Sequence, residues 1–415
     1  MVRLNPLTLA AIILLAVALF AGLIWVNYRA ASFNSRGDLF VGLWVAARSL
    51  MFDGNSPYTP GVTAQIEQKM YGRSAQDDEP SGRVMYPLYA SFLFLPYALI
   101  GDVLWARAVW LTVLEAALLI DMLAAIRLTG WRPPSWLLLL NALFSIFWLH
   151  GLAPLLDGSP VILAGLFFVL ALLSLRAGRD ELAGILCALA TIQPVTFLLP
   201  LLFLLLWSFA QRRWALVVAF LGALAVLITV GMFIIPDWPL QYLRQILNFP
   251  LYTPQQTLGA AFAAWAPGIG RQAGWGVTLI VSIILCLEGW LALGRGWNGL
   301  LWTLSLILVL SQWIGLPASP LNFVLLTLPL TLIFAVLEDR FRLAGRAVAV
   351  MTIGLLGFGL WAVYWRTTLF ANGLQLPAGL FIPVPLLLFV GLYWIRWWAI
   401  RPRRLFVEIL RERFE

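Results

Sequence analysis

The chain has 415 residues, of which 62% are hydrophobic and 11% are charged, and its mean hydropathy is +0.91. A soluble domain carries about 25% charged residues, so this composition excludes a soluble globular fold and indicates an all-α polytopic membrane protein. The net charge of +8 comes mostly from arginines in short clusters between apolar runs. Such clusters are typical of the positive-inside rule, which argues against a nucleic-acid partner and for contact with membrane lipids.

Apolar runs long enough to cross a bilayer, about 20 residues each, follow one another along most of the chain. The first, near residues 7–26, is too long for a signal-peptide core and is expected to be a retained span. The others lie near residues 85–100, 104–126, 135–152, 158–175, 181–193, 194–209, 213–235, 275–293, 299–315, 319–337, 345–365 and 378–399.

These are 13 runs, an odd number. Both chain ends are expected on the same side of the membrane, which requires an even number of complete crossings. One of the runs is therefore expected not to cross completely. The run 85–100 is the best candidate, since it is short and contains Pro87 and Pro96. We therefore expect about 12 crossings plus one re-entrant or half-span segment. The runs 181–193 and 194–209 are also short and are broken at Gln193-Pro194, so they form either two thin helices or a bent hairpin.

Placing the arginine-bearing connections in the cytoplasm fixes the orientation. Two long connections, residues 27–84 and 236–274, then face outward, together with short ones that contain His150, Gln193 and Arg366. No soluble domain is left over, so residues 1–415 are expected to form a single integral membrane domain. The predicted location is the plasma membrane of the bacterial inner-membrane type, with function on the outer face, where the irregular backbone gathers.

The first outer loop, residues 27–84, contains an amphipathic helix over residues 39–53. Its apolar residues recur at helical spacing, which predicts that it lies on the membrane surface. Gly54 is placed to end this helix, and a second short helix is expected from Val62 to Tyr71. The apolar positions of the first helix are Leu39, Phe40, Leu43, Trp44, Ala47, Leu50 and Met51.

Asp38 directly precedes this helix and has two compatible interpretations. It is placed to be the N-cap, whose carboxylate accepts hydrogen bonds from backbone amides. A carboxylate at the water boundary beside apolar surface is also suited to act as a general base, because desolvation raises its pKa.

Other outward-facing polar residues are weaker candidates. His150, the single histidine, and Asp157 form either a boundary pair or an acid/base or donor-binding site. Arg244, Arg271 and Arg366 lie in outer connections against the positive-inside trend, so they contact either lipid headgroups or a substrate phosphate.

Two groups of acids leave further alternatives open. Asp77, Asp78 and Glu79 form either a solvated turn or a site for a divalent cation, and no metal site is assigned. Glu115, Asp121 and Glu288 fall inside apolar runs, where acids either pair between helices or line an ion path.

Two segments resemble glycosyltransferase family 87. The first loop reads GDLFVGLWVAARSL and then DGNSPYTP, which is similar to the family pattern of an Asp after the first span, an Ala-Ala-containing helix and a Pro-Tyr-x-Pro turn. The segment MYPLYASFLFLPYALI, from Met85 to Ile100, is similar to the Tyr-Pro-rich entry that follows in that family. The likeness extends loosely to about residue 340.

This resemblance implies a membrane fold of the GT-C type and an inverting hexosyltransferase, similar to mannosyltransferases, of the cell envelope. The donor would be a polyprenyl-phosphate-linked sugar and the acceptor a lipid or glycan, with no cofactor assigned. Asp38 would be the catalytic general base. Tyr58, in the Pro-Tyr-x-Pro turn, and Tyr86, in the Tyr-Pro segment, would lie at the substrate, and an arginine would stabilise the departing phosphate.

The sequence departs from the family pattern at two places. Asp157-Gly158-Ser159-Pro160 stands where a Gly-Gln-x-Asn type segment is frequent, and Gln193-Pro194 stands where Lys-Pro is frequent. The second departure removes a lysine that would contact a phosphate, leaving Gln193 as the outer-face polar group at that position.

Three other functions fit the composition. A secondary transporter or lipid flippase would use Glu115, Asp121 and Glu288 as an ion-coupled path, although no internal repeat relates the two halves. A glycan polymerase or ligase of the outer face would depend on residues of a later loop, such as Arg244 and Arg271. A non-catalytic membrane subunit would depend on its surface rather than on Asp38.

Overall fold

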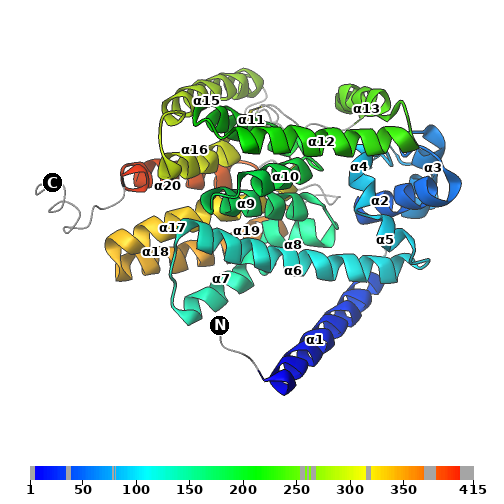
Figure 1. Ribbon diagram of the computed structural model, residues 1–415, viewed down its shortest axis with the longest axis horizontal. Helices are drawn as coiled ribbons and strands as arrows, with labels where there is room; N and C mark the ends of the chain where they lie inside the picture. The colour runs from blue at the N-terminus through cyan, green and yellow to red at the C-terminus, as the bar shows by residue number, and fades with distance from the viewer. Residues whose placement is uncertain are drawn as a thin grey trace, which may run out of the picture. The chain divides into compact units, whose positions relative to one another are not determined.

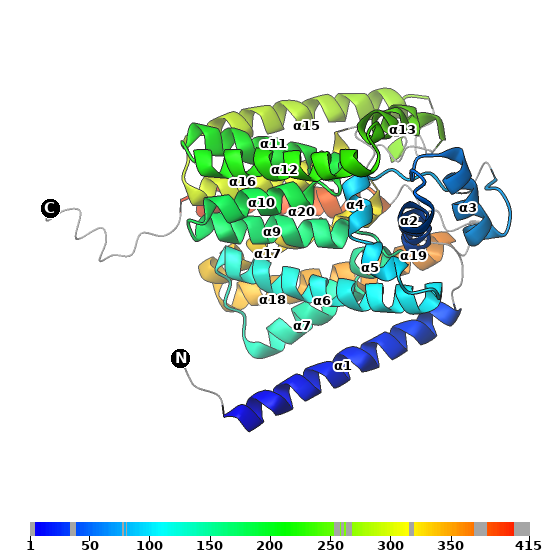
Figure 2. The ribbon, with the colours of Figure 1, turned by 45° about the vertical axis from the view of Figure 1, so that its right-hand side comes forward.

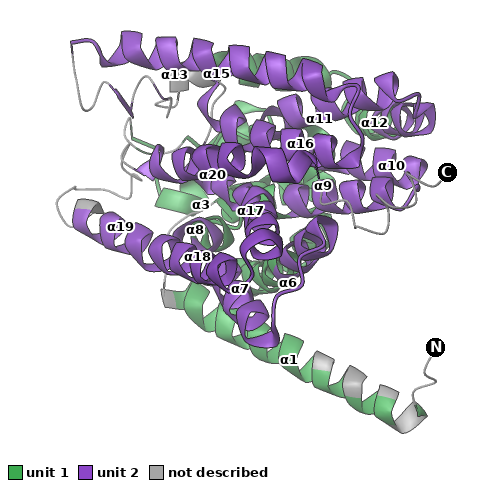
Figure 3. Ribbon diagram, turned by 90° about the vertical axis from the view of Figure 1, so that its left-hand side faces the viewer, with its two compact units in different colours: residues 1–118, 153–162, 225–254 green, residues 119–152, 163–224, 255–415 purple. Residues whose placement is uncertain are grey.

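The computed structural model describes residues 5–33, 39–76, 79, 81–252, 258, 261–262, 268–314, 319–368 and 380–401. These residues form helices and connecting turns, without strands (Figure 1). The chain divides into two compact units (Figure 3). Unit 1 comprises residues 1–118, 153–162 and 225–254, and unit 2 comprises residues 119–152, 163–224 and 255–415.

Among the described residues, 6 helical segments are long and apolar enough to cross a membrane, or up to 7 if a pair bent by 48° is one span. The helical membrane fold is confirmed, and each of these segments coincides closely with a predicted run. The expected total of about 12 crossings is not confirmed. The segments are Val103–Thr129, Trp214–Ile234, Gly270–Ala292, Pro320–Phe341, Leu343–Arg366 and Pro383–Ile400, and the bent pair is Ser135–Phe147 with Leu149–Leu156.

In unit 1, helix α1 (Pro6–Phe33) is followed in the first loop by α2 (Leu39–Arg48), which continues into a π-helical turn (Ser49–Asp53). This helical stretch ends at Gly54, whose φ of 66° is left-handed. Helix α3 (Pro60–Tyr71) begins where the Thr59 side chain accepts a hydrogen bond from the Val62 amide. Both predicted loop helices are thus present, at nearly the predicted bounds.

The apolar face of α2 packs against protein. The Phe40 ring lies 6.2 Å from that of Phe94 and 6.3 Å from that of Trp110, and the Trp44 indole donates a 3.0 Å hydrogen bond to the Tyr97 carbonyl. Only the far end of the stretch, with Met51 and Phe52, is exposed. The 85–100 segment thus supplies apolar partners for the main part of this helix, and its position on the membrane surface stays a prediction.

The run 85–100 forms two short helices, α4 (Leu88–Phe92) and α5 (Leu95–Ala98). Pro87 precedes the first, and Pro96 lies at the start of the second, where its missing amide is tolerated. Helices of 5 and 4 residues rise roughly 7 Å each, so neither is long enough to cross a bilayer. Helix α6 (Val103–Thr129) follows, and the Asp102 carboxylate accepts hydrogen bonds from two amides of its first turn.

Unit 2 is built around α16 (Trp297–Leu310) and α17 (Thr327–Phe341), whose residues are largely buried. Helices α10 (Asp180–Ala190) and α11 (Pro194–Ala210) form a hairpin that breaks at Gln193-Pro194, one of the two forms expected. The other α-helices among the described residues are α7 (Ser135–Phe147), α8 (Leu149–Leu156), α9 (Val161–Arg176), α12 (Trp214–Ile234), α13 (Trp238–Tyr252), α15 (Gly270–Ala292), α18 (Leu343–Gly354), α19 (Leu360–Thr368) and α20 (Pro383–Ile400).

The tight basic turns of unit 2 share one end, which we call the basic end (Figure 2). They join α6 to α7, α9 to α10, α11 to α12, α15 to α16 and α17 to α18, and the last turn of α20 lies there too. This is the arrangement that the positive-inside rule predicts. The arginines of this end include Arg132, Arg179, Arg213, Arg295, Arg342 and Arg401.

Gly158 offers a test of how closely unit 1 is packed. Its φ is +68°, and a Cβ built on it would lie 2.6 Å from the Cβ of Phe40. Gly54 has nearly the same φ, +66°, but nothing within 4 Å of such a Cβ. Gly54→Ala should therefore cost about 1 kcal/mol from the backbone alone, whereas Gly158→Ala should add an overpacking cost of about 1–3 kcal/mol.

The measurement is thermal unfolding of the purified variants in detergent. Gly158→Ala should lower the melting temperature at least twice as much as Gly54→Ala. Equal effects would show that the contact between the 157–158 turn and α2 is loose.

Candidate functional site

The start of α2 is held by Asp157. The Leu39 amide lies 3.3 Å from the Asp157 Oδ1 atom, and the Phe40 amide donates to the Asp157 carbonyl oxygen at 3.2 Å. The Leu39 nitrogen belongs to the peptide bond that joins this residue to Asp38. Asp38 itself lies outside the described residues. Asp157 therefore binds the peptide group that directly follows Asp38, the other acid that the sequence singles out.

Helix α6 fixes the turn that carries Asp157. The buried Arg107 guanidinium donates to the Leu156 carbonyl at 2.9 Å, and the Trp110 indole donates to the Gly158 carbonyl at 2.8 Å. Gly158 allows the turn because its φ is left-handed. The backbone on both sides of Asp157 is thus attached to one rigid helix, which makes Asp157 a firm anchor for α2.

Burial sets the charge state of Asp157. Desolvation raises the pKa of this carboxyl from 3.8 to about 6, against the lowering effects of the Leu39 amide and of Arg107. The group therefore titrates just below neutral pH. A carboxylate in this state interacts strongly with nearby charges, since it is only partly hydrated.

A cluster of tyrosines and glutamines joins the first loop to α13 within unit 1. The Tyr58 hydroxyl donates to the Tyr86 carbonyl at 2.7 Å, and the Gln245 amide donates to the Tyr58 carbonyl at 3.3 Å. Ser56 donates to the Gln241 side chain at 2.5 Å, and the Tyr58 and Tyr242 rings lie 6.1 Å apart. The two long connections predicted to face outward are therefore linked.

Burial raises the pKa of Tyr58 and that of Tyr242 well above the usual range, so both phenols stay neutral. The Tyr58 hydroxyl is engaged with the Tyr86 backbone, and its ring is buried. Tyr58 and Tyr86, predicted as substrate-binding residues, are thus brought together, and the observed bond gives the Tyr58 side chain a supporting role in the loop.

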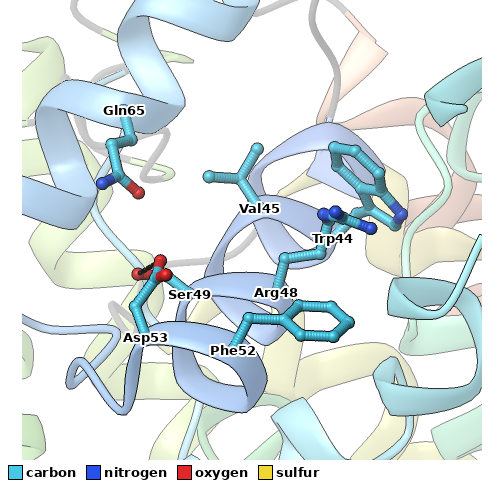
Figure 4. A pocket seen from close by; sticks show the side chains of 7 residues that line it. All are labelled: Trp44, Val45, Arg48, Ser49, Phe52, Asp53 and Gln65. Atoms are coloured by element: carbon cyan, nitrogen blue, oxygen red, sulfur yellow. Dashed lines mark hydrogen bonds between the residues drawn. The ribbon is translucent and has the colours of Figure 1, made fainter. Parts of the chain in front are cut away.

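A cavity of about 220 Å³ lies between α2, the π-helical turn and α3 (Figure 4). On one side the Arg48 guanidinium stands 5.0 Å from the centres of both the Trp44 and the Phe52 rings and donates to the Ala98 carbonyl. On the other side Gln65 projects from α3 toward Asp53. Aromatic, amide, carboxylate and guanidinium groups together suit a ligand rich in hydroxyl groups. Val45 and Ser49 complete the lining.

His150 bonds to a backbone carbonyl oxygen. It belongs to unit 2, is fully buried, and its Nδ1 lies 2.9 Å from the Pro320 carbonyl oxygen, which places the proton on Nδ1. Its ring packs between Trp148 and Phe323. A backbone carbonyl from a distant part of the sequence thus satisfies one nitrogen of the imidazole, while the buried Nε2 has no hydrogen-bond partner among the described residues. The pair of His150 with Asp157, which belongs to unit 1, stays a prediction.

The remaining predicted site residues lie on separate helices. Arg244 is exposed on α13 of unit 1, whereas Arg271, in the first turn of α15, and Arg366, in the last turn of α19, are exposed on unit 2. Gln193 precedes the first turn of α11. The exposed arginines are free of tight packing and accessible to an anion.

The acidic segment after α3 is only partly described. Asp77 and Asp78 lie outside the described residues, and Glu79 accepts two hydrogen bonds from Arg73, at 2.7 and 2.8 Å, which lower the pKa of Glu79. Within the described ranges no group of three or more His, Cys, Asp or Glu residues is placed to hold a metal ion.

Sequence reasoning missed Arg107, Trp110 and Gln65. Arg107 carried a signal, since an arginine near the start of an apolar run needs a partner. Trp110 and Gln65 carried none, because apolar and amide residues are common in such helices and only the fold brings them to the 157–158 turn and to the cavity.

No protein-family model matches this chain, and no curated protein matches it. The likeness to glycosyltransferase family 87 rests on the residues of the first loop and the Tyr-Pro segment.

The pKa of Asp157 predicts a pH dependence of stability. Its pKa in the folded protein, about 6, exceeds the ordinary value of 3.8, so the folded state binds the proton more tightly than the unfolded state. The stability that this group contributes is therefore greatest below about pH 4, falls as the pH rises to about 6, and is constant above that. The full change is on the order of 3 kcal/mol.

Asp157→Asn lacks this titration, so the melting temperature of the wild type relative to this variant should decrease from pH 4 to pH 6. A relative melting temperature that rises over this interval would show that the ionised carboxylate is the favoured form.

Proposed function

We propose that this protein is a membrane glycosyltransferase of the GT-C type, which transfers a mannose-like hexose from a polyprenyl-phosphate-sugar donor to a lipid or glycan acceptor. The observation that carries the proposal is the anchoring of the peptide group after Asp38 by Asp157, at 3.3 Å from the Leu39 amide. A transferase needs its base held in a fixed geometry, and an anchored helix start provides such a position.

Asp38 would act as the general base. It would take the proton from the acceptor hydroxyl while the hydroxyl oxygen attacks the anomeric carbon, and the bond from that carbon to the phosphate oxygen would break with inversion. Asp157 would act as a positioning residue, because it holds the backbone that carries Asp38. The negative charge of Asp157 would also lie close to the same backbone and would disfavour ionisation of Asp38. This would raise the pKa of Asp38 and make it a stronger base.

The cavity along α2 supports the same function. Arg48 lies nine residues after Leu39, so the cavity is about 14 Å from the helix start. At that distance it suits a part of the substrate that does not react, such as a neighbouring sugar of a glycan acceptor. Phe52 offers an exposed ring for stacking, and Asp53 and Gln65 offer partners for hydroxyl groups.

The donor phosphate would need a cation. Arg107 is committed to the Leu156 carbonyl, whereas Arg244 of the same unit is exposed and would stabilise the departing phosphate. The other two predicted arginines, Arg271 and Arg366, belong to unit 2. A divalent cation at the 77–79 segment stays an alternative source of this charge.

The membrane arrangement that goes with this function has about 12 crossings, with the active face on the outer side of a bacterial plasma membrane. In this arrangement, further described helices would add to the 6 or 7 candidate spans. Helix α1 has 28 residues, α9 has 16 and α11 has 17, which corresponds to about 42, 24 and 26 Å.

An ion-coupled transporter receives no specific support. Each of the three intramembrane acids has a hydrogen-bond partner within its own unit. Glu115 accepts from Asn27 at 3.1 Å, Asp121 from Thr327 at 3.3 Å and Glu288 from Arg396 at 2.8 Å. These contacts favour the alternative in which such acids pair between helices.

The test compares three Asp→Asn variants in membranes supplied with radiolabelled polyprenyl-phosphate sugar. Asp38→Asn should reduce transfer by about 10²–10⁴-fold, the usual contribution of a general base, although Asn still serves as an N-cap. Asp157→Asn should reduce transfer roughly tenfold, because the amide side chain anchors α2 less firmly.

Asp102→Asn is the matched control. Asp102 caps α6 by accepting from the Leu104 and Trp105 amides, and Asn can do the same, so transfer should stay at the wild-type level. Full transfer by Asp38→Asn would remove Asp38 from the mechanism.

A further inference from the structure

The basic end of unit 2 contains a charge cluster that the proposed function does not use. Glu288, near the end of α15, accepts a 2.8 Å hydrogen bond from Arg396 of α20 and a 3.4 Å one from the Tyr393 hydroxyl. Arg295, just after α15, places its Nη1 4.0 Å from the same carboxylate. Two guanidinium groups thus face one carboxylate, and the cluster carries a net positive charge.

The hydrogen-bonding capacity of this cluster is incomplete. The Nη1 atom of Arg295 and the Nε atom of Arg396 are covered by the protein but have no hydrogen-bond acceptor. A covered donor without a partner costs about 1–3 kcal/mol, and more when it is charged. The two donors therefore lack an acceptor, and the cluster lacks one negative charge.

The position of the two arginines is fixed by their neighbours. The Arg396 guanidinium lies 5.3 Å from the centre of the Trp302 ring, and the Arg295 carbonyl accepts a 3.0 Å hydrogen bond from the Trp207 indole. The Gln211 amide donates to the Leu293 carbonyl in the same turn at 2.8 Å. The backbone of the α15–α16 turn is thus held firmly, while about 30% of each arginine side chain remains exposed.

Exposed tryptophans lie at the same level of α15 and α20 as the cluster, within two residues of Glu288 or Arg396 in the sequence. Trp290 on α15 and Trp394 and Trp397 on α20 are 77%, 69% and 63% exposed. Tryptophan is enriched at the boundary between hydrocarbon and headgroups, and the apolar faces of α15 and α20 that carry these rings are suited to lipid. The ligand that meets the arginines at this level is therefore amphipathic, with its anionic group beside the rings.

We propose that Arg295 and Arg396 bind the phosphate of an anionic phospholipid headgroup at the basic end of unit 2. Guanidinium groups bind phosphate oxygens through paired N–H donors, and basic pockets between membrane helices are suited to such headgroups. Arg295 is the residue that responds to the lipid, because at 4.0 Å it makes no hydrogen bond with Glu288 and a small rotation turns it toward a phosphate.

The test is a lipid titration of the purified full chain, followed by native mass spectrometry, with phosphatidylglycerol as the probe and phosphatidylcholine as the neutral comparison. The wild type should bind the first phosphatidylglycerol at least tenfold more tightly than phosphatidylcholine. Arg295→Gln should lose about tenfold or more of this affinity, the effect expected for a charged hydrogen bond. It should keep its melting temperature in the absence of lipid, because Glu288 retains Arg396.

Arg340→Gln is the matched control. Arg340 is exposed at the basic end of unit 2 and stacks on Trp398 at 5.7 Å, so it contributes the same general positive charge without the Glu288 cluster. Its replacement should leave the first binding step unchanged. Arg295→Lys keeps the charge without the paired donors and should bind at an intermediate level, which provides a second variant if Arg295→Gln does not fold.

Equal losses in Arg295→Gln and Arg340→Gln would overturn the proposal in favour of general attraction by the basic end. A third arm adds inorganic phosphate alone. Arg295-dependent binding of inorganic phosphate, without a preference for phosphatidylglycerol over phosphatidylcholine, would overturn the lipid as the source of the phosphate.

Discussion

The structure of unit 1 depends on the attachment of the 156–158 turn to α6. Arg107 and Trp110 hold the carbonyl oxygens on either side of Asp157 at 2.9 and 2.8 Å, and Asp157 in turn holds the first two amides of α2. Because α2 packs through Phe40 and Trp44 onto the 85–100 segment, the same attachment positions the loop. One turn thus connects a membrane helix, a loop helix and the peptide group beside Asp38.

This arrangement joins stability to the proposed chemistry. Because the pKa of Asp157 is about 6, its carboxyl is ionised at neutral pH and stabilises the folded protein less than a neutral side chain would. Such a group is typical of a functional site. The cost is offset by apolar packing around Trp110 and Phe94, whose rings lie 4.6 Å apart. The proposed role of Asp157 as a positioning residue follows from this combination.

Much of the helix pattern could be predicted from the sequence, because apolar length, Gly54 and the break at Gln193-Pro194 act locally. Hydrophobic spacing also predicts the buried face of α2, but it does not say that the 85–100 segment covers this face. The Pro320 carbonyl that binds His150 could not be predicted for a related reason, because the two residues are far apart in the sequence. Arg107 and Gln65 become part of the candidate site only through contacts between distant segments. Asp157, which the sequence singled out, bonds to the Leu39 amide.

The central claim is that Asp157 anchors the start of α2. Hydrogen–deuterium exchange of the wild type and of Asp157→Ala tests it directly, because a hydrogen-bonded amide exchanges only when its bond opens. The Leu39 amide, whose only described partner of this kind is the Asp157 carboxylate, should exchange roughly 10- to 100-fold faster in the variant, while α3 exchanges as in the wild type. Unchanged exchange at the start of α2 would contradict the claim.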